Sequence, residues 1–376
     1  MSSYWKYHFE PYEEERIRKR PHLRAVPKRR AKKNSNPLGV LILGLLLYFV
    51  FFPMMKNTYD YALFNKMKNA KIDVDAGKIY NSAQKLVANT HLFGRDFVGH
   101  VEENRPKMSP LKLNYEMKNL KNNIQYVINQ YPNLQAGVFV WDYQTKNYVD
   151  INGEKQFSAA SIIKVPILVE MFKRIESGNL DLYEKFKMTS YYRTGGSGYL
   201  QYRPEGADFE MNELAAYMIR TSDNTATNMI LSAVGGAQEM NMALRSWGFA
   251  QTYVKTWLPD LYGTNVTTPK DMATILYNAD NPDFLSLENR SRIVDIMSKV
   301  KNTSLLKQGI PDSATLIHKT GDIGEMLGDV GVVTMPDGRR YIITVMVKRR
   351  WNDYSARTLI NSISSVTYNS FAANNL

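Results

Sequence analysis

Three short polar motifs follow one another along the chain, and together they could carry out acyl transfer through a serine. The first contains Ser161 and Lys164, the second is Ser-Asp-Asn at residues 222–224, and the third is Lys-Thr-Gly at residues 319–321. They would supply a hydroxyl nucleophile, an amine that takes its proton, a second hydroxyl that carries a proton, and a cation for a substrate carboxylate. This chemistry uses no histidine, metal ion or cofactor, so we expect none of these in the site.

The pair Ser161 and Lys164 is distinguished by its surroundings, because the Ser-x-x-Lys spacing alone is common here. The spacing occurs six times, beginning at Ser3, Ser82, Ser109, Ser161, Ser298 and Ser304. Around Ser161, small residues precede it at 158–160 and an apolar stretch follows at 165–169, which is typical of the start of a buried helix. The first turn of a helix places residues three apart on one face, and burial lowers the pKa of a lysine so that it can take the serine proton. The alternative is a helix-capping serine beside a solvated lysine.

The Ser-Asp-Asn motif lies between residues 214–219 and 226–231, two stretches that are helical in pattern. We expect Ser222 to relay a proton and the amide of Asn224 to bind a substrate amide. Asp223 is expected to tie the loop to backbone groups. The alternative is an ordinary N-cap and turn between two helices.

The Lys-Thr-Gly motif follows residues 315–318, which have the composition of a strand. On an edge strand, Lys319 and Thr320 could hold the carboxylate of a substrate that adds alongside. Gly321 would let the two backbones approach closely. The alternative is an ordinary strand end.

The elements that must position these motifs are strands and a helix at each end of the domain, with helices between. We expect a helix near 111–130, a hairpin of strands 136–143 and 148–151, mainly helices from 160 to 250, a second hairpin of strands 331–335 and 341–347, and a closing helix at 353–371. This order predicts an α/β fold of the α+β kind, with an antiparallel sheet built from both ends of the domain and a separate helical lobe.

With their flanking residues, the three motifs resemble those of the penicillin-recognising serine enzymes, and within them the class A β-lactamase-like group. Further matches lie at 195–200, 222–228, 267–269, 318–321 and 328–333, and the resemblance covers residues 111–376. It implies a β-lactamase/transpeptidase-like fold and a serine hydrolase.

The resemblance also implies a role for each site residue. Ser161 is the acylated nucleophile, Lys164 its general base, and Ser222 the hydroxyl that protonates the leaving nitrogen. The substrate-binding residues are Asn224, Lys319, Thr320, Gly321 and Asp322, with Arg340 as a further ligand of the carboxylate. The backbone N–H groups of Ser161 and Asp322 form the oxyanion hole, where each donor is typically worth about 3–4 kcal/mol.

One loop departs from the family pattern. Class A β-lactamases carry Trp-Glu-Pro-Glu-Leu-Asn, whose first Glu and final Asn hold the water that frees the acyl-enzyme. The counterpart here is Trp-Leu-Pro-Asp-Leu-Tyr at residues 257–262. Leu258 replaces the Glu and Tyr262 the Asn, and leucine can neither accept a proton nor orient water. We therefore expect acylation with slow deacylation, unless Asp260 or another acid substitutes.

The composition narrows the classes of partner. The chain has 376 residues and no cysteine, which excludes disulfides, thiolate nucleophiles and cysteine-bound metals. Its net charge is +12, but residues 1–36 hold eleven Lys or Arg against four Glu and so contribute +7. Because the remainder is only mildly basic, we expect no nucleic-acid partner.

The N-terminal region has the pattern of a membrane anchor. Residues 37–55 are nineteen residues without a charge, close to the roughly 20 that span a bilayer core as a helix. The alternatives are a cleaved signal peptide or a core helix. The basic tail at 1–36 predicts a cytoplasmic N-terminus, followed by the anchor at 37–55, a stalk at 56–105 and an extracytoplasmic catalytic domain at 106–376.

These features favour a single-pass membrane enzyme that faces the cell wall and acts on a small-molecule or peptidoglycan-derived substrate. The substrates expected are β-lactams, D-Ala-D-Ala-type peptides or other amides and esters, which leaves a carboxypeptidase, glutaminase or esterase open. The other class is a non-catalytic binding or scaffold protein. The oligomeric state is left open.

Overall fold

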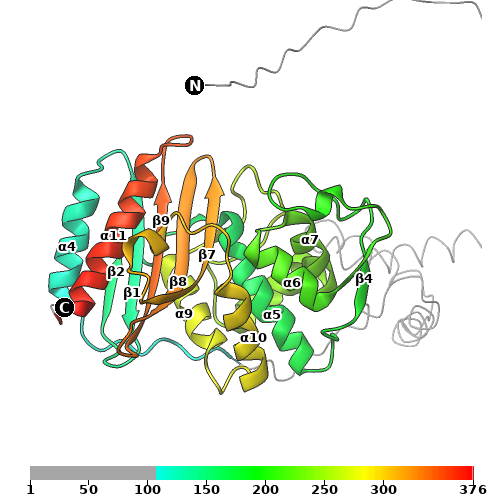
Figure 1. Ribbon diagram of the computed structural model, residues 1–376, viewed down its shortest axis with the longest axis horizontal. Coiled ribbons are helices and arrows are strands. Elements are labelled where there is room, and N and C mark those ends of the chain that lie inside the picture. Colours follow the sequence, from blue (N-terminus) through cyan, green and yellow to red (C-terminus); the bar gives the residue numbers. More distant parts are fainter. Residues whose placement is uncertain (1–106, 375) are drawn as a thin grey trace, which may run out of the picture. The chain divides into compact units, whose positions relative to one another are not determined.

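The computed structural model describes residues 107–374 and 376 (Figure 1). The expected tail at 1–36, membrane segment at 37–55 and stalk at 56–105 lie outside the described residues, as does the boundary at 106. Within the described part of the chain, no helix is both long and apolar enough to cross a bilayer.

The site is supported by an antiparallel sheet with the strand order β2-β1-β9-β8-β7. Its strands are β1 (Gln135–Asp142), β2 (Tyr148–Ile151), β7 (Thr315–Ile323), β8 (Met326–Thr334) and β9 (Arg340–Lys348). β1 pairs with β9 along its whole length, so an early strand and the last strand lie side by side in the middle of the sheet. Both predicted hairpins are confirmed, as is a sheet built from both ends of the domain.

Helices cover both faces of the sheet (Figure 1). α4 (Lys118–Asn129) and α11 (Ser355–Ala372) pack on one face, and the helical lobe lies on the other. Along β1, Val138 and Val140 belong to the core beneath α4 and α11, whereas Phe139 and Trp141 belong to the core shared with the lobe. Successive strand residues point to opposite faces. Because both faces are buried, β1 is almost continuously apolar in sequence.

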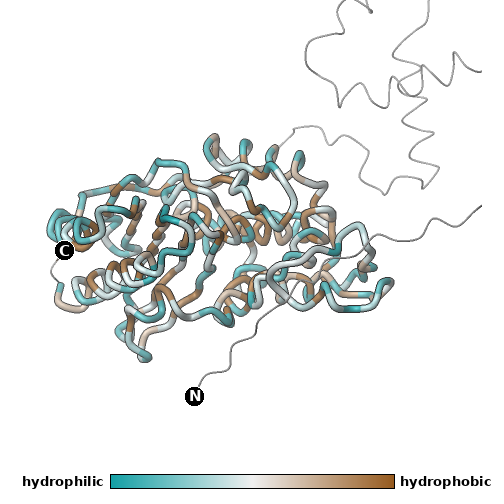
Figure 2. The backbone as a smooth tube through the Cα atoms, turned by 90° about the horizontal axis from the view of Figure 1, so that it is seen from above, coloured by the Kyte–Doolittle hydropathy of each residue, from teal (hydrophilic) through white to brown (hydrophobic). Residues whose placement is uncertain are grey.

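The lobe is built around α5 (Lys164–Glu176), whose first nine residues are all buried. The other lobe helices are α6 (Met211–Arg220), α7 (Asn224–Ala233), α8 (Gly236–Ser246), α9 (Pro269–Ala279) and α10 (Leu287–Met297). Short elements complete it: β3 (Phe157–Ser158), β4 (Lys185–Lys187), β5 (Asp208–Glu210), β6 (Val266–Thr267), η3 (Ala160–Ile163) and η4 (Leu200–Tyr202). The short turn η5 (Leu306–Gly309) packs instead against α11 on the other face of the sheet. Figure 2 shows hydrophobic residues running through the interior and hydrophilic residues gathered at the periphery.

The first predicted helix is shorter than expected, because residues 111–117 are not helical. Instead, this segment pairs with the outer edge of β2: the Tyr148 N–H donates to the Tyr115 carbonyl (3.0 Å), and the Met117 N–H donates to the Tyr148 carbonyl (2.7 Å). These bonds satisfy backbone groups that an uncovered edge strand would leave unpaired. The helix α4 begins only at Lys118.

Candidate active site

Ser161 lies in the 3₁₀ turn η3, which leads directly into α5 at Lys164. In a 3₁₀ turn, side chains three residues apart are in line. The Lys164 Nζ is accordingly 3.0 Å from the Ser161 Oγ. The chain enters the turn through Ala160 at a φ of 44°, a left-handed conformation that costs on the order of 1–3 kcal/mol in a residue other than glycine. The sequence predicted the first turn of a helix, and the 3₁₀ geometry makes the alignment of the two side chains closer still.

The Lys164 amine is completely buried and surrounded by oxygen atoms. Besides Ser161, it contacts the Ser222 carbonyl (2.7 Å), the Asn224 Oδ1 (2.9 Å) and the Ser222 Oγ (3.1 Å). A neutral amine has two N–H donors and one lone pair. The two carbonyl oxygens can only accept, so they take the two N–H groups. The lone pair is then left for a hydroxyl proton, as a general base requires.

The orientation of the Asn224 amide follows from its other contact. Its Nδ2 donates to the Gly195 carbonyl at 3.1 Å, which leaves Oδ1 directed toward Lys164. Asn224 is the first residue of α7. Its position is therefore fixed by the helix and by the 195–200 loop together.

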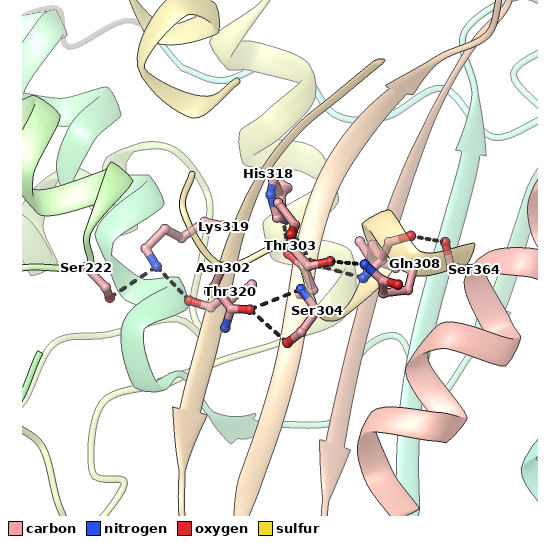
Figure 3. Close-up of polar contacts among 11 residues, drawn as sticks. Ser222, Asn302, Thr303, Ser304, Gln308, His318, Lys319, Thr320 and Ser364 are labelled. Atoms are coloured by element: carbon pink, nitrogen blue, oxygen red, sulfur yellow. Dashed lines mark hydrogen bonds and ion pairs between the residues drawn. The ribbon is translucent and has the colours of Figure 1, made fainter. Parts of the chain in front are cut away.

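Two buried amines lie on either side of one hydroxyl. The Ser222 Oγ is 3.1 Å from the Nζ of Lys164 and 3.1 Å from the Nζ of Lys319. Figure 3 shows the contact between Ser222 and Lys319. Ser222 has a φ of 56°, a second left-handed residue next to the Lys164 amine. This hydroxyl is placed to pass a proton between the two amines and a bound substrate.

Burial makes both amines weaker bases. It lowers the pKa of Lys164 well below its ordinary value, the charge of Lys319 lowers it further, and Asp223 partly opposes the shift. Burial also lowers the pKa of Lys319, to about 8, against the opposing charge of Asp329. Lys164 therefore loses its proton first, while Lys319 stays charged at neutral pH.

Asp329 lies on β8, opposite Thr320 of the Lys-Thr-Gly strand, and is fully buried. Its carboxylate bonds to the His318 Nδ1 at 2.9 Å and accepts the Leu306 N–H at 3.1 Å. Figure 3 shows His318 close to Lys319 on the same strand. In the described part of the chain, no group of three or more His, Asp or Glu side chains could hold a metal ion.

Asp223 ties the Ser-Asp-Asn turn to the preceding loop, as predicted. One carboxylate oxygen accepts the N–H groups of Tyr199 (2.6 Å) and Leu200 (2.8 Å), and the other accepts the Ala226 N–H (2.9 Å) at the start of α7. A Cβ on Gly198 would lie 2.2 Å from this carboxylate, so only glycine fits there.

The Lys-Thr-Gly motif lies on β7, the last strand of the sheet. Lys319 is fully buried, and its Nζ donates to the Thr320 carbonyl at 2.7 Å. A Cβ on Gly321 would lie 2.9 Å from the Ile162 side chain and 3.2 Å from the Ala159 carbonyl. The sequence assigned this glycine to the approach of a substrate. In the structure, it allows β7 to lie against the turn that bears the nucleophile.

The prediction for Arg340 is wrong. Its guanidinium pairs with Asp280 at 2.6 Å and lies over the ring of Tyr143. The charge of Arg340 is therefore paired away from the three motifs. The arginine near the Lys-Thr-Gly strand is Arg349, which is buried and pairs with the half-exposed carboxylate of Asp322. Two pairs of arginines, at 339–340 and 349–350, lie at the two ends of β9. The sequence alone does not indicate which of these four side chains is buried.

The loop that departs from the family pattern is held by backbone contacts at 258 and by the Leu258 side chain, which is buried in the core of the lobe. The Leu258 N–H donates to the Asn228 Oδ1 (2.9 Å), and the Asn228 Nδ2 donates back to the Leu258 carbonyl (2.8 Å). No role for Asn228 could be predicted from the sequence, although this residue ends the matching stretch at 222–228. Both oxygens of Asp260 are bound within the loop, by the Thr264 hydroxyl (3.0 Å) and the Asn265 N–H (2.6 Å). Asp260 is thus a structural residue of the loop.

The structure brings Ser161, Lys164, Ser222, Asn224 and Lys319 into one hydrogen-bonded cluster. Thr320, Gly321 and Asp322 continue from it along β7. The cluster therefore contains the parts that acyl transfer needs: a nucleophile, a buried amine whose pKa is lowered, a shared hydroxyl, and a buried lysine on the outermost strand.

Comparisons with known proteins agree with this arrangement. A model of the β-lactamase enzyme family matches residues 119–371. The chain is 26% identical over 275 residues to β-lactamase VEB-1 of Pseudomonas aeruginosa, covering 68% of this chain and 91% of that protein. It is 28% identical over 232 residues to a β-lactamase of Bacillus licheniformis, covering 58% and 73% of the two chains.

Solved structures include nearer relatives. PBP-A is 38% identical, with a TM-score of 0.68, and the match covers 71% of this chain and 100% of PBP-A. One PBP-A structure is an acyl-enzyme complex with penicillin G, in a variant with a leucine replaced by glutamate. An ancestral class A β-lactamase is 26% identical, with a TM-score of 0.63, covering 67% and 100% of the two chains. The family match spans well over half of the sequence, and the chain belongs to the β-lactamase enzyme family of serine hydrolases.

Proposed function

We propose that Ser161 is acylated by β-lactams or by D-Ala-D-Ala-type amides and that the acyl-enzyme is hydrolysed slowly. The observation that carries this proposal is the buried Lys164 amine, 3.0 Å from the Ser161 hydroxyl with both N–H groups directed at carbonyl oxygens. An amine so placed can take the serine proton at neutral pH.

The acylation steps follow from the contacts of Lys164. Its lone pair takes the Ser161 proton as the serine oxygen attacks the substrate carbonyl, and the N–H groups of Ser161 and Asp322 stabilise the oxyanion. When the C–N bond breaks, the Ser222 hydroxyl gives its proton to the leaving nitrogen. It regains a proton from the Lys164 ammonium, 3.1 Å away. Lys164 ends the cycle neutral.

Charge and hydrogen bonding orient the substrate. Lys319 and the Thr320 hydroxyl bind its carboxylate, and the free N–H of the Asn224 amide donates to its acyl amide. The same groups would recognise the carboxylate of a β-lactam and that of a terminal D-Ala. Burying the amines of Lys164 and Lys319 is energetically unfavourable. A non-catalytic scaffold protein would have no physical reason to keep two lysines buried at this cost.

Slow deacylation follows from the loop at 257–262. Leu258 has no proton acceptor, and the carboxylate of Asp260 is bound inside the loop. Tyr262 is 94% exposed, so it does not hold a water in the site as an asparagine would. A thousandfold slower hydrolysis corresponds to about 4 kcal/mol. The penicillin G acyl-enzyme of PBP-A, a relative 38% identical, supports acylation here; because that complex is of a variant with a leucine replaced by glutamate, it does not bear on the rate of deacylation.

We also propose that residues 37–55 anchor the chain in a membrane, with residues 1–36 in the cytoplasm and the catalytic domain facing the cell wall. The support is the uncharged stretch and the basic tail before it. A peptidoglycan-derived substrate suits that location.

Covalent labelling tests the proposed nucleophile. Incubated with a fluorescent penicillin, the full-length protein should carry a stable label that survives denaturation, and Ser161→Ala should abolish it. Ser298→Ala is the matched control, because it removes a serine with the same Ser-x-x-Lys spacing at the end of α10. Folded wild-type protein that takes no label would favour the scaffold alternative.

Restoring the loop carboxylate should speed deacylation. We expect Leu258→Glu to raise the release rate of the penicilloyl group at least about tenfold, because Glu can activate a water where Leu cannot. Mass spectrometry of the acylated protein over time measures the release. Leu258→Gln, equally long but without a base, should leave the rate near that of the wild type. Rapid release from the wild type would contradict the role assigned to Leu258.

Acylation should have a bell-shaped pH dependence, since it requires neutral Lys164 and protonated Lys319. The second-order acylation rate constant should fall on the alkaline side near pH 8, where Lys319 loses its proton. Asp329→Asn removes the charge that raises this pKa, so the alkaline limb should move to lower pH. Lys319→Arg should remove the limb from this range, because a guanidinium does not titrate there. A limb unchanged by both variants would assign the titration to another group.

Fractionation tests the anchor. The full-length protein should stay with membranes after extraction at alkaline pH, and external protease should reach the catalytic domain in spheroplasts. Replacing three leucines at 45–47 with lysine should release it, because each charge at the centre of a spanning helix costs about 2.5–3.5 kcal/mol. A soluble full-length protein would refute the proposal.

A further inference from the structure

Arg349 is a buried arginine beside the end of the Lys-Thr-Gly strand, and no step of the proposed mechanism uses it. It follows β9 directly. Its guanidinium pairs with the carboxylate of Asp322, and its Nε donates to the Gly324 carbonyl at 3.1 Å. One of its terminal nitrogens, Nη1, donates to the Asp353 carbonyl at 3.4 Å. The side chain thus connects the end of β7 with the segment that precedes α11.

The main chain next to Arg349 holds the same end of β7 by itself. The Arg349 N–H donates to the Glu325 carbonyl at 2.9 Å, and the Asn352 N–H donates to the Gly324 carbonyl at 2.8 Å. These bonds fix the turn between β7 and β8 without the guanidinium. We therefore expect that removing the guanidinium leaves the turn in place and chiefly changes the charge beside Asp322.

The carboxylate of Asp322 lies close to the place where negative charge develops during acylation. In the proposed function, the Asp322 N–H donates to the oxyanion. A carboxylate oxygen is four bonds from its own backbone nitrogen, and so no more than about 5 Å from it. The oxyanion lies about 3 Å beyond that nitrogen. The two negative charges are then at most about 8 Å apart, which is within the Debye length at physiological salt. An unpaired carboxylate at this position would raise the energy of the transition state.

Two arginines counter the charge of Asp322. Burial raises the pKa of its carboxyl, and the charges of Arg349 and Arg357 oppose the shift. Arg349 is the partner in direct contact, and its side chain is 5% exposed, against 52% for that of Asp322. Because a buried charge is screened less by salt than an exposed one, Arg349 can offset the carboxylate where a surface cation would not.

We propose that Arg349 is a positioning residue of the oxyanion hole, which acts through Asp322 by holding and neutralising its carboxylate so that this charge does not oppose the oxyanion. The inference rests on the proposed function, because it needs the acylation of Ser161. The benefit arises only when the carbonyl oxygen becomes charged. Arg349 therefore acts on the chemical step and not on the initial binding of the substrate.

Stopped-flow acylation of the full-length protein by a fluorescent penicillin separates these two steps. Arg349→Gln should lower the acylation rate constant by roughly three- to tenfold and leave the dissociation constant of the initial complex within about twofold. Arg349→Lys keeps the positive charge and should lose less. Arg339→Gln is the matched control, because Arg339 lies at the other end of β9, where it also pairs with an aspartate and donates to a main-chain carbonyl. It should leave the rate constant unchanged.

A double-mutant cycle with Asp322→Asn tests whether Arg349 acts through the carboxylate. In that background, Arg349→Gln should lower the acylation rate constant by less than about twofold, because no charge is left to neutralise. Asp322→Asn alone should raise the rate constant, since it leaves the Arg349 cation unpaired near the oxyanion. This second result tests the inference even where Arg349→Gln does not fold.

Three results would overturn the inference: an unchanged rate constant in folded Arg349→Gln protein, an equal loss in both backgrounds, or slower acylation of Asp322→Asn. An equal loss would mean that Arg349 only braces the backbone at Gly324 and Asp353. A wild-type protein that is not acylated at all would instead refute the proposed function.

Discussion

The buried amine of Lys164 places the strictest demand on the rest of the domain. A neutral amine stays in the interior only if its N–H groups find acceptors. Here the acceptors are the carbonyl of Ser222, turned inward by a left-handed backbone, and the amide oxygen of Asn224, held by α7 and the 195–200 loop. The nucleophile turn and the 222–224 turn must therefore meet at one nitrogen, and the 195–200 loop must hold the Asn224 amide in place. The contacts of Asp223 with Tyr199, Leu200 and Ala226 hold two of them together.

The sheet supplies the third side of the site. β7 bears Lys319, and the absence of a side chain at Gly321 lets that strand approach the nucleophile turn. On the neighbouring strand β8, the buried carboxylate of Asp329, which is hydrogen-bonded to His318, opposes the loss of the Lys319 proton. Burial lowers the pKa of both amines; the charge of Lys319 lowers the pKa of Lys164 further, whereas the charge of Asp329 opposes the shift of Lys319.

Much of this could be predicted from the sequence, for identifiable reasons. The small residues before Ser161 and the apolar residues after Lys164 distinguish this pair from the other Ser-x-x-Lys pairs of the chain. The packing partner of Gly321 could not be predicted, because it lies about 160 residues away along the chain. The mistaken role of Arg340 has a similar cause, since the inward-turning arginine depends on the register of β9. Residues 111–117 have helical spacing, but the unpaired edge of β2 competes for their backbone.

The clamp between Asn228 and the backbone of Leu258 bears on how activity could change in evolution. The loop is held through main-chain atoms and through Asp260, but the side chain at position 258 is also buried in the core of the lobe. No single base change converts a leucine codon into a glutamate codon. A lineage would pass through an intermediate residue such as valine or glutamine, neither of which is a base. Because position 258 is buried, a polar residue there also costs stability, so the codon table and the core of the lobe both oppose the gain of a hydrolytic group.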